Sequence, residues 1–321
     1  MGLNRLPIKE KISRHLLSLD DKRKLRIGVG CAWMGRGEDY RDTLESDLAI
    51  LMASYEKGFR YYDTSRQYGE SEKVVGEFVK RIPRETIFLA TKSPYPRMKD
   101  SHKRNFQVFK DNFYRSFERL QTDYIDLYQI HDTDHYESCV EEVIPFLQER
   151  REEGLISYIG MATLSLHELE VAAREGIINS VLSYMQYSLL KKSAEPLISL
   201  TNKMDIAFVN AAILHYGLIL SENPLKYNLE CNLPHMNRLR ETTFRMQELC
   251  RTMGLPILFA ALQFSLLKSE IDITLNGFSD ASQLISTLDA LKQPIYPEQW
   301  AEIMKLQESL PMMYVQDDMQ G

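Results

Sequence analysis

The stretch GFRYYDTSRQYGESEKVVGEF, residues 58–78, holds one short apolar run, one polar segment and one helix-like segment. Residues 61–64 (YYDT) are typical of a short buried strand. The polar segment that follows carries Tyr68, and apolar residues then return up to Phe78. We interpret the stretch as a strand–loop–helix unit, in which Asp63 lies at the end of the strand and Tyr68 lies in the loop.

The same kind of unit recurs along the chain. Short β-branched or aromatic runs, each followed by a helical pattern, predict eight strands at residues 26–30, 61–64, 87–92, 125–131, 156–162, 181–187, 206–212 and 272–277. These runs do not alternate cleanly between polar and apolar residues, as expected of parallel strands that are covered on both faces. The sequence therefore predicts an α/β fold, a (β/α)8 TIM barrel. A doubly wound sheet is the weaker alternative, because GVGCAWMG after the first strand lacks the G-x-G-x-x-G spacing.

Apolar residues at helical spacing predict helices between these strands. The predicted helices include one before Gly58 and others at residues 106–120, 239–253, 281–291 and around 300–304, whereas 220–236 is predicted to be a large loop. No linker of low complexity divides the chain. We predict a single barrel domain over residues 1–321, with 1–24 as an N-terminal extension and 294–321 as a C-terminal helix and tail.

Composition limits the classes of function. The chain has 321 residues, is 44% hydrophobic and has a net charge of −6, so no basic excess points to a nucleic-acid partner. No apolar run approaches the ~18 residues of a membrane span, and no signal peptide is visible at the N-terminus. The cysteines suit neither a zinc site nor a disulfide framework, which favours a reducing cytoplasm and predicts no metal: Cys31, Cys139, Cys231 and Cys250. The oligomeric state stays open.

Polar residues stand where successive predicted strands end, which is where TIM barrels carry their active sites. Asp63, Lys92 and His131 end the second, third and fourth strands, and Tyr68 lies in the loop after Asp63. A nearby ammonium lowers the pKa of a phenol, and an aspartate keeps that ammonium charged. A histidine can orient a substrate oxygen. Such a set moves a proton on and off a carbonyl or alcohol oxygen, and a cofactor must supply the hydride.

Each of the four residues also has a plain structural interpretation. Asp63 could cap the next helix, Tyr68 could pack, Lys92 could be a solvated charge and His131 could be a buried structural histidine. Their common place at one rim favours catalysis.

Three segments resemble the aldo-keto reductase family: GFRYYDTSRQYGESEKVVGEFV, FLATK and SFERLQTDYIDLYQIH. The resemblance covers nearly the whole chain and implies a (β/α)8 barrel that uses NADPH or NADH. It also implies a catalytic tetrad formed by Asp63, Tyr68, Lys92 and His131. Further segments, such as GLISYIGMATLSL and VLSYMQYSLL, are similar to the sugar dehydrogenase branch, which includes L-galactose, L-fucose and D-threo-aldose 1-dehydrogenases. Those enzymes oxidise the C1 hydroxyl of an aldose to a lactone.

The resemblance also implies a cofactor site, with contacts from Ala162, Thr163, Tyr184, Ala211, Leu214, Gly277, Ser279 and Gln283. Three positions depart from the family: Ala162-Thr163 replaces Ser-Asn, Tyr184 replaces Gln, and NAAIL (210–214) replaces a Ser-Pro-Leu segment. The stretch NGFSDASQLIST (276–287) has no Lys or Arg to hold the 2′-phosphate of NADP, and Asp280 would repel it. We therefore expect NAD to be preferred over NADP, unless Lys191 or Lys192 reaches in.

For the substrate, we expect Trp33 to wall the site and His215, with Tyr216, to contact substrate or cofactor. His135 and Tyr136 are predicted to be loop residues and not ligands. The leading hypothesis is an NAD(P)-dependent oxidoreductase that acts on an aldose or a related small carbonyl. Two alternatives stay open: a general aldehyde or ketone reductase, and a redox-sensing regulatory subunit that binds the cofactor with little turnover.

Overall fold

The computed structural model describes residues 6–18, 24–37, 39–95, 102–132, 136–228 and 236–309. His135 and Cys231 therefore lie outside the described residues, as do parts of the predicted N-terminal extension, the loop at 220–236 and the C-terminal tail.

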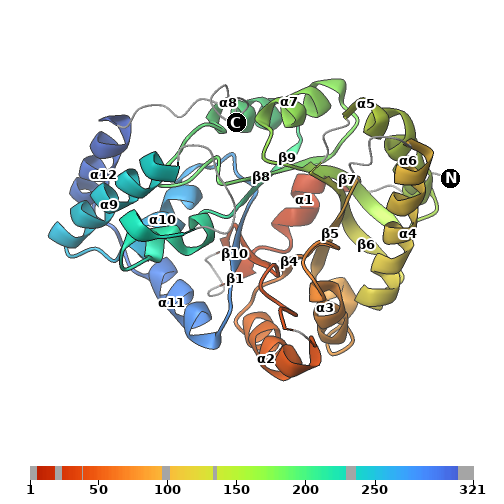
Figure 1. Ribbon diagram of the computed structural model, residues 1–321, viewed down its shortest axis with the longest axis horizontal. Coiled ribbons are helices and arrows are strands. Elements are labelled where there is room, and N and C mark those ends of the chain that lie inside the picture. Colours follow the sequence, from red (N-terminus) through yellow and green to blue (C-terminus); the bar gives the residue numbers. More distant parts are fainter. Residues whose placement is uncertain are drawn as a thin grey trace.

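A closed barrel of parallel strands forms the centre of the molecule, in the order β10-β3-β4-β5-β6-β7-β8-β9 (Figure 1). The predicted (β/α)8 barrel is confirmed, with strands at β3 (Ile27–Gly30), β4 (Tyr61–Asp63), β5 (Phe88–Pro94), β6 (Ile125–His131), β7 (Ile156–Ala162), β8 (Ser180–Tyr184), β9 (Ala207–Ala211) and β10 (Ile273–Gly277). The largest difference is at the sixth barrel strand, which ends at Tyr184 and not at residue 187.

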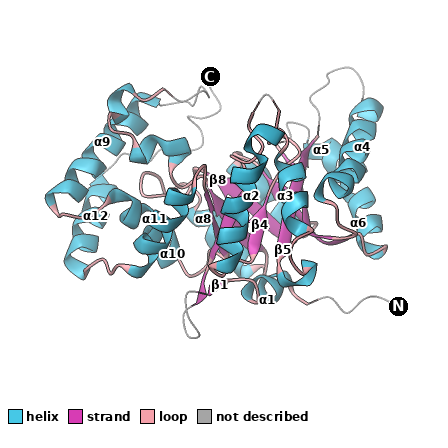
Figure 2. Cartoon of the chain, turned by 90° about the horizontal axis from the view of Figure 1, so that it is seen from below, coloured by secondary structure: helices cyan, strands magenta, loops and turns pink. Residues whose placement is uncertain are grey.

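The barrel strands are buried on both faces. All residues of β4 and β6 are buried, which explains why their sequences do not alternate between polar and apolar residues. Inside the barrel, the rings of Tyr61 and Phe88 stack with their centroids 4.8 Å apart. Helix α1 (Ile8–Ser13) lies below the barrel (Figure 2) and adds Ile8 and Ile12 to this inner core. The lower end of the barrel is thus closed, and the end where the strands finish is left for chemistry.

Helices surround the barrel (Figure 2). They are α2 (Arg41–Glu56), α3 (Ser71–Val79), α4 (His102–Leu120), α5 (Tyr136–Ser138), α6 (Ile144–Glu152), α7 (Leu166–Glu175), α8 (Glu195–Lys203), α9 (Met236–Thr252), α10 (Ile257–Leu267), α11 (Ala281–Lys292) and α12 (Pro297–Ser309). Shorter elements are the 3₁₀ turns η1 (Arg84–Thr86), η3 (His215–Leu220) and η4 (Pro224–Lys226), the π-helical turn η2 (Cys139–Val143), and a hairpin of β1 (Leu17–Ser18) and β2 (Lys24–Leu25).

The connection between β9 and β10 contains more helices than the sequence predicted. Its described part contains η3, η4 and two helices, α9 and α10, whereas only the first of these helices was predicted. Helix α10 packs against α11, and α12 packs against α9, so these four helices form one group beside the barrel (Figure 1).

Within the described residues, no single helix is both long and apolar enough to span a membrane. Helices α9 and α10 meet that criterion only when taken together, and they are bent by 105° at the break between them.

Candidate active site

The barrel brings the four predicted catalytic residues to one rim. Asp63 is the last residue of β4 and His131 is the last residue of β6, while Lys92 lies in β5 between them. Tyr68 lies in the turn that connects β4 to α3. Because parallel strands all end on the same side of a barrel, residues that are up to 68 positions apart become neighbours.

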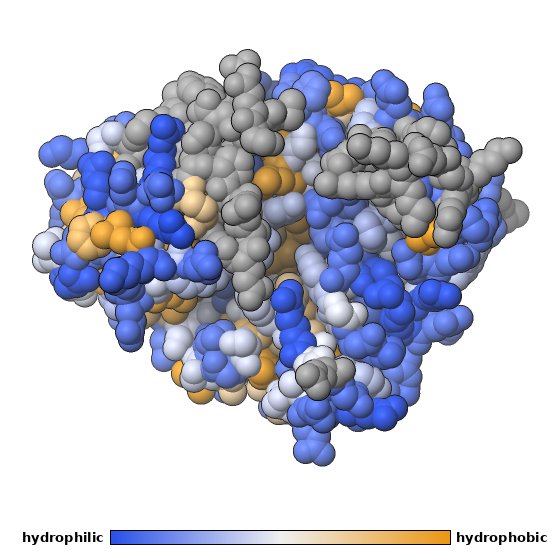
Figure 3. All heavy atoms as spheres, in the orientation of Figure 1, coloured by the Kyte–Doolittle hydropathy of each residue, from blue (hydrophilic) through white to orange (hydrophobic). Residues whose placement is uncertain are grey.

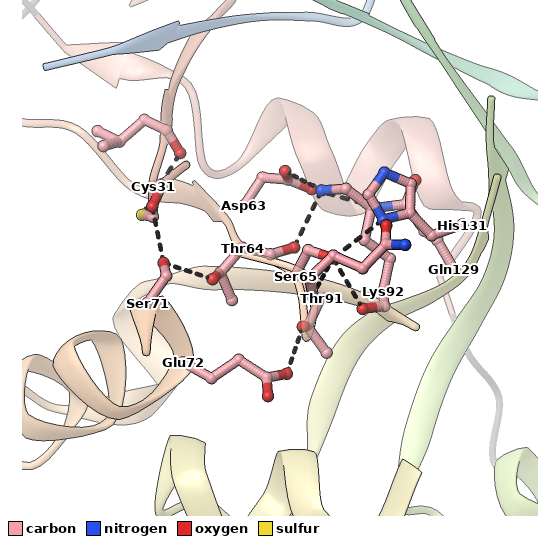
Figure 4. A network of polar contacts seen from close by, with 12 residues as sticks. Cys31, Asp63, Thr64, Ser65, Ser71, Glu72, Thr91, Lys92, Gln129 and His131 are labelled. Carbon is pink, nitrogen blue, oxygen red and sulfur yellow. Dashed lines mark hydrogen bonds and ion pairs between the residues drawn. The ribbon is translucent and has the colours of Figure 1, made fainter. Parts of the chain in front are cut away.

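Lys92 and Asp63 form a buried ion pair below the rim (Figure 4). The Lys92 Nζ donates to Asp63 Oδ1 at 2.5 Å and to the Thr64 carbonyl oxygen at 2.9 Å. The second carboxylate oxygen of Asp63 accepts from the amide of Gln129 at 3.2 Å. These bonds fix the ammonium in place.

Lys92 and Asp63 each favour the charged form of the other. Burial lowers the pKa of Lys92, but Asp63 and Tyr68 together raise it by more, so its pKa lies above the ordinary value. Lys92 is therefore an ammonium at neutral pH. Burial raises the pKa of Asp63, whereas the Lys92 ammonium and the Gln129 amide act in the opposite direction.

Tyr68 lies close to both Lys92 and His131. The Lys92 Nζ is 4.8 Å from the centroid of the Tyr68 ring, and the rings of Tyr68 and His131 meet edge to face at 5.8 Å. Burial raises the pKa of Tyr68, and the Lys92 ammonium lowers it by less. The sequence-based expectation that Lys92 brings the pKa of Tyr68 below its ordinary value is thus corrected, because burial outweighs the ammonium.

His131 is held between two polar neighbours. Its Nδ1 lies 3.0 Å from the Ser65 hydroxyl, and its Nε2 lies 3.3 Å from Asp132 Oδ2. Burial lowers the pKa of His131 well below its ordinary value, and the nearby Lys92 ammonium adds to this. The imidazole is therefore neutral at physiological pH, and it can orient an oxygen without carrying a charge.

A cavity of about 700 Å³ opens above these groups and extends toward α11. Three members of the tetrad line it, namely Asp63, Tyr68 and His131. The face drawn in Figure 3 is hollowed near its centre, and hydrophobic side chains lie within the hollow. A site that is partly apolar and carries a few convergent polar groups suits a small organic molecule.

Most of the other predicted contacts also line this cavity: Trp33, Tyr184, Ala211, Leu214, Gly277, Ser279 and Gln283. Ala162 and Thr163 are not among the lining residues, and both are buried at the end of β7. Tyr136, which was expected to be a loop residue, begins α5.

His215 does not reach the cavity, so the expectation that it contacts substrate is corrected. It is 1% exposed, and its Nε2 lies 2.7 Å from the Ser188 hydroxyl. Burial lowers the pKa of His215 to about 3. The backbone has positive φ at Ala212 and at all residues from His215 to Gly217, and this left-handed path turns the histidine inward while Tyr216 lines the cavity.

The structure adds residues that the sequence interpretation missed. Asp132 follows His131 directly, lines the cavity and accepts a hydrogen bond from the Tyr184 hydroxyl at 2.8 Å. Arg36 also lines the cavity, and its guanidinium lies 4.8 Å from the Trp33 ring centroid. The one sequence signal that Asp132 lies at the cavity was its position directly after His131, the last residue of β6.

The N-terminus of α11 forms the far end of the cavity. Asp280 caps this helix by accepting from the Gln283 backbone N–H at 3.1 Å. The Gln283 amide donates to the Ser279 hydroxyl at 2.7 Å. Hydrogen bonds to Ser282 and Gln283 lower the pKa of Asp280, so a full negative charge stands at this helix end.

Among the described residues, no group of three His, Cys, Asp or Glu side chains could hold a metal ion. Of the described cysteines, Cys31, Cys139 and Cys250 are buried thiols that form no disulfide.

Comparison with protein families identifies the family of the chain. The family model described as "Aldo/keto reductase family" matches residues 26–308, which is most of the chain. The chain belongs to the aldo/keto reductase family. Membership of this family indicates that the aldo/keto reductase is an oxidoreductase acting on a carbonyl or alcohol group.

Two relatives bear on the branch of the family. The L-galactose dehydrogenase of Arabidopsis thaliana is 27% identical over 277 residues, which cover 83% of this chain and 84% of the relative. The D-threo-aldose 1-dehydrogenase of Pseudomonas sp is 26% identical over 282 residues, which cover 79% of this chain and 86% of the relative. This aldo/keto reductase is thus similar along most of its length to proteins named as sugar dehydrogenases.

Solved structures agree on the fold. The holo form of aldo-keto reductase AKR11C1 from Bacillus halodurans superposes with a TM-score of 0.68 at 26% identity, covering 91% of this chain and 95% of that one. An aldo/keto reductase from Klebsiella pneumoniae, solved in complex with NADP and acetate, has a TM-score of 0.66 at 18% identity and covers 93% of this chain and 99% of that one. The latter likeness concerns the fold alone.

Proposed function

We propose that this aldo/keto reductase transfers a hydride between a nicotinamide cofactor and C1 of an aldose, with Tyr68 as the general acid and base. Two lines of argument support the proposal. The tetrad residues lie together at the barrel rim, and two relatives that match most of the chain are named as sugar dehydrogenases.

The position of Asp132 is the observation that favours a sugar as the substrate. Its carboxylate lies in the cavity, 3.3 Å from His131 Nε2, and Tyr184 donates to its other oxygen. A carboxylate offers several acceptor sites, and the hydroxyl groups of a sugar are donors that suit them. Trp33 and Tyr216 add exposed aromatic rings at the cavity, against which the C–H face of a sugar can pack.

The residues of the chain have separate tasks in this reaction. His131 orients the substrate oxygen, and Tyr68 exchanges a proton with that oxygen: it accepts the proton when the C1 hydroxyl is oxidised and donates it when a carbonyl is reduced. Lys92 favours the phenolate form of Tyr68 and is kept charged by Asp63. The cavity is lined partly by Leu182, Leu214 and Leu275, which limit the access of water.

The cavity fits a nicotinamide dinucleotide. Small residues stand along it, which lets a flat ring approach the barrel end: Gly30, Ala32, Ala211, Ala212 and Gly277. Beyond them, Ser279 and Gln283 lie at the N-terminus of α11, and Ser286 and Thr287 line the cavity from its second turn. We propose that these residues, with Tyr184 and Leu214, hold the cofactor, which supplies or accepts the hydride when bound.

NAD is the proposed cofactor in preference to NADP. The segment from residue 276 to 287 contains no Lys or Arg, and the negative charge of Asp280 stands at the N-terminus of α11. A 2′-phosphate placed at this end would meet that charge. We also propose a cytoplasmic location, which suits the reduced thiols of Cys31, Cys139 and Cys250.

A general aldehyde reductase is the second candidate. It is favoured by the apolar side chains along the cavity, including Leu220 and Leu258, and by a 30% identity over 167 residues to the methylglyoxal reductase DkgA of Escherichia coli. That match covers only 50% of this chain.

The test is a substrate panel with the purified enzyme and with an Asp132→Asn variant. Aldoses and simple alcohols are assayed for oxidation, and aldehydes for reduction, each with NAD(H) and with NADP(H). We expect an aldose with NAD to have the highest kcat/KM. Asp132→Asn should raise KM for the aldose about 10- to 150-fold, which matches the loss of one hydrogen bond to a charged group, and leave KM for a simple aldehyde nearly unchanged.

Other outcomes of the panel would replace the proposal. A higher kcat/KM for simple aldehydes than for every aldose would establish the general reductase. Absence of turnover on all substrates, with cofactor retained through purification, would instead indicate a redox-sensing subunit.

A further inference from the structure

Ser65 lies directly behind the catalytic histidine. It is fully buried in the turn that follows β4, three residues before Tyr68 (Figure 4). Its hydroxyl oxygen lies 3.0 Å from His131 Nδ1 and 3.1 Å from the Lys92 carbonyl oxygen, and it accepts from the Gln67 backbone N–H at 3.1 Å. The single proton of this hydroxyl can serve either the imidazole or the carbonyl.

The surroundings of the Lys92 carbonyl favour the imidazole. This carbonyl already accepts the Arg66 backbone N–H at 2.9 Å, so it has a partner without Ser65. The Gln67 N–H occupies one acceptor position of the Ser65 oxygen. The Ser65 proton is therefore available to His131 Nδ1.

The surroundings of Nε2, on the opposite edge of the imidazole, also indicate that Nδ1 accepts a hydrogen bond from Ser65. Nε2 lies 3.3 Å from Asp132 Oδ2, and an ionised carboxylate can only accept hydrogen bonds. A neutral imidazole carries one N–H, and His131 is neutral because its pKa is lowered. With the proton on Nε2, the ring donates to Asp132 and accepts from Ser65. With the proton on Nδ1, a bare nitrogen lone pair would face a carboxylate.

We propose that Ser65 is a positioning residue, which holds His131 in the tautomer with its proton on Nε2 and so presents an N–H donor to the substrate oxygen. The catalytic effect of this tautomer rests on the proposed function, but the tautomer itself is present in the enzyme without substrate. Asp132 accepts from Nε2 in the free enzyme. When a sugar binds, its oxygen takes over that N–H, and the carboxylate can accept from a neighbouring sugar hydroxyl.

The tautomer has a direct chemical consequence. An N–H donor stabilises negative charge on the reacting oxygen as Tyr68 removes the hydroxyl proton, whereas a bare nitrogen would repel that charge. Loss of the Ser65 hydroxyl leaves Nδ1 without its donor, so the Nδ1–H and Nε2–H forms become closer in population.

The experiment is ¹⁵N NMR of the histidine side chains in the substrate-free enzyme, comparing wild type, Ser65→Ala and the control Ser93→Ala. His131 is assigned from the signals that disappear in His131→Asn. Ser93 is a matched control, because its hydroxyl is also buried and, among the described residues, it bonds to the Tyr128 hydroxyl at 2.6 Å and not to His131. We expect the Nε2–H pattern in wild type and Ser93→Ala, and a mixture with the Nδ1–H form in Ser65→Ala.

Two results would overturn the inference: an Nδ1–H pattern in wild type, or an unchanged Nε2–H pattern in Ser65→Ala. If Ser65→Ala does not fold, Ser65→Gly, which also lacks the hydroxyl, gives the same test, and a wild-type-like pattern there overturns it equally. Where turnover is measurable, kcat should fall about 3- to 10-fold in Ser65→Ala and stay unchanged in Ser93→Ala. Failure of every substrate would contradict the proposed function and leave the NMR result standing.

Discussion

The environment of Tyr68 has two opposing effects on the pKa of its phenol. Burial raises its pKa and the Lys92 ammonium lowers it, and burial is the larger of the two. The sequence identified the residues that act on this proton but not their balance, because burial depends on how loops from several strands cover the rim. Ser65 was missed for a related reason, since a serine in a loop has many possible partners until the fold places it beside His131.

Removing Lys92 tests this balance. In Lys92→Met the lowering effect on Tyr68 is lost, so the pKa of Tyr68 rises further. Oxidation needs the phenolate, so its rate rises with pH through the pKa of Tyr68. We expect the rising limb of the kcat/KM profile to move to higher pH, with a loss of about 10-fold or more at neutral pH. Lys57→Met, at an exposed position, is the control and should keep the wild-type profile.

Stability must be followed in the same variant. Lys92→Met leaves the buried Asp63 carboxylate without its cation, which costs about 3–5 kcal/mol in comparable pairs. The double variant Lys92→Met with Asp63→Asn removes this orphan charge and should recover much of the loss in urea unfolding. An unshifted pH profile in folded Lys92→Met would exclude Lys92 from control of Tyr68.

Single elements differed in how well the sequence predicted them. The barrel strands were recognisable because each is a short run buried on both faces. Helix α10 was missed because its sequence, ILFAALQFSLL, is apolar almost throughout and shows no polar face that would indicate a helix. The inward turn of His215 follows from left-handed backbone at several non-glycine residues, which has no clear sequence signal.

The N-terminus of α11 offers a prediction on cofactor choice. Asp280→Asn removes the negative charge but keeps a good helix cap, so the fold should be unaffected. We expect KM for NADP to fall about 5-fold, which corresponds to about 1 kcal/mol of repulsion near a surface, while KM for NAD stays the same. Steady-state kinetics with both cofactors measures this.

Asp289→Asn is the control for this change, because it removes an exposed carboxylate from the other end of the same helix. Equal effects of the two variants on KM for NADP would show that net charge, and not the position of Asp280, is responsible. A wild-type enzyme that already prefers NADP would contradict the cofactor proposal itself.

At the scale of the whole molecule, the closed barrel explains why distant residues act together. Asp63, Lys92 and His131 come from three neighbouring strands, and Tyr68 comes from the loop after the first of these. Parallel order alone predicts that these residues share a rim, so the sequence was sufficient for the tetrad. It was insufficient for parts of the cavity wall, because Asp132 and Arg36 lie in connections whose paths depend on packing.

The most direct test of the whole account is the turnover of Tyr68→Phe with the best aldose of the panel and NAD. This change keeps the ring beside His131 and deletes the hydroxyl that exchanges the proton. We predict a fall in kcat of ~10²–10⁴-fold, the usual contribution of positioned proton transfer, with the affinity for NAD in fluorescence titration nearly unchanged. Turnover within a factor of about two of wild type would contradict the role of Tyr68 and, with it, the proposed mechanism.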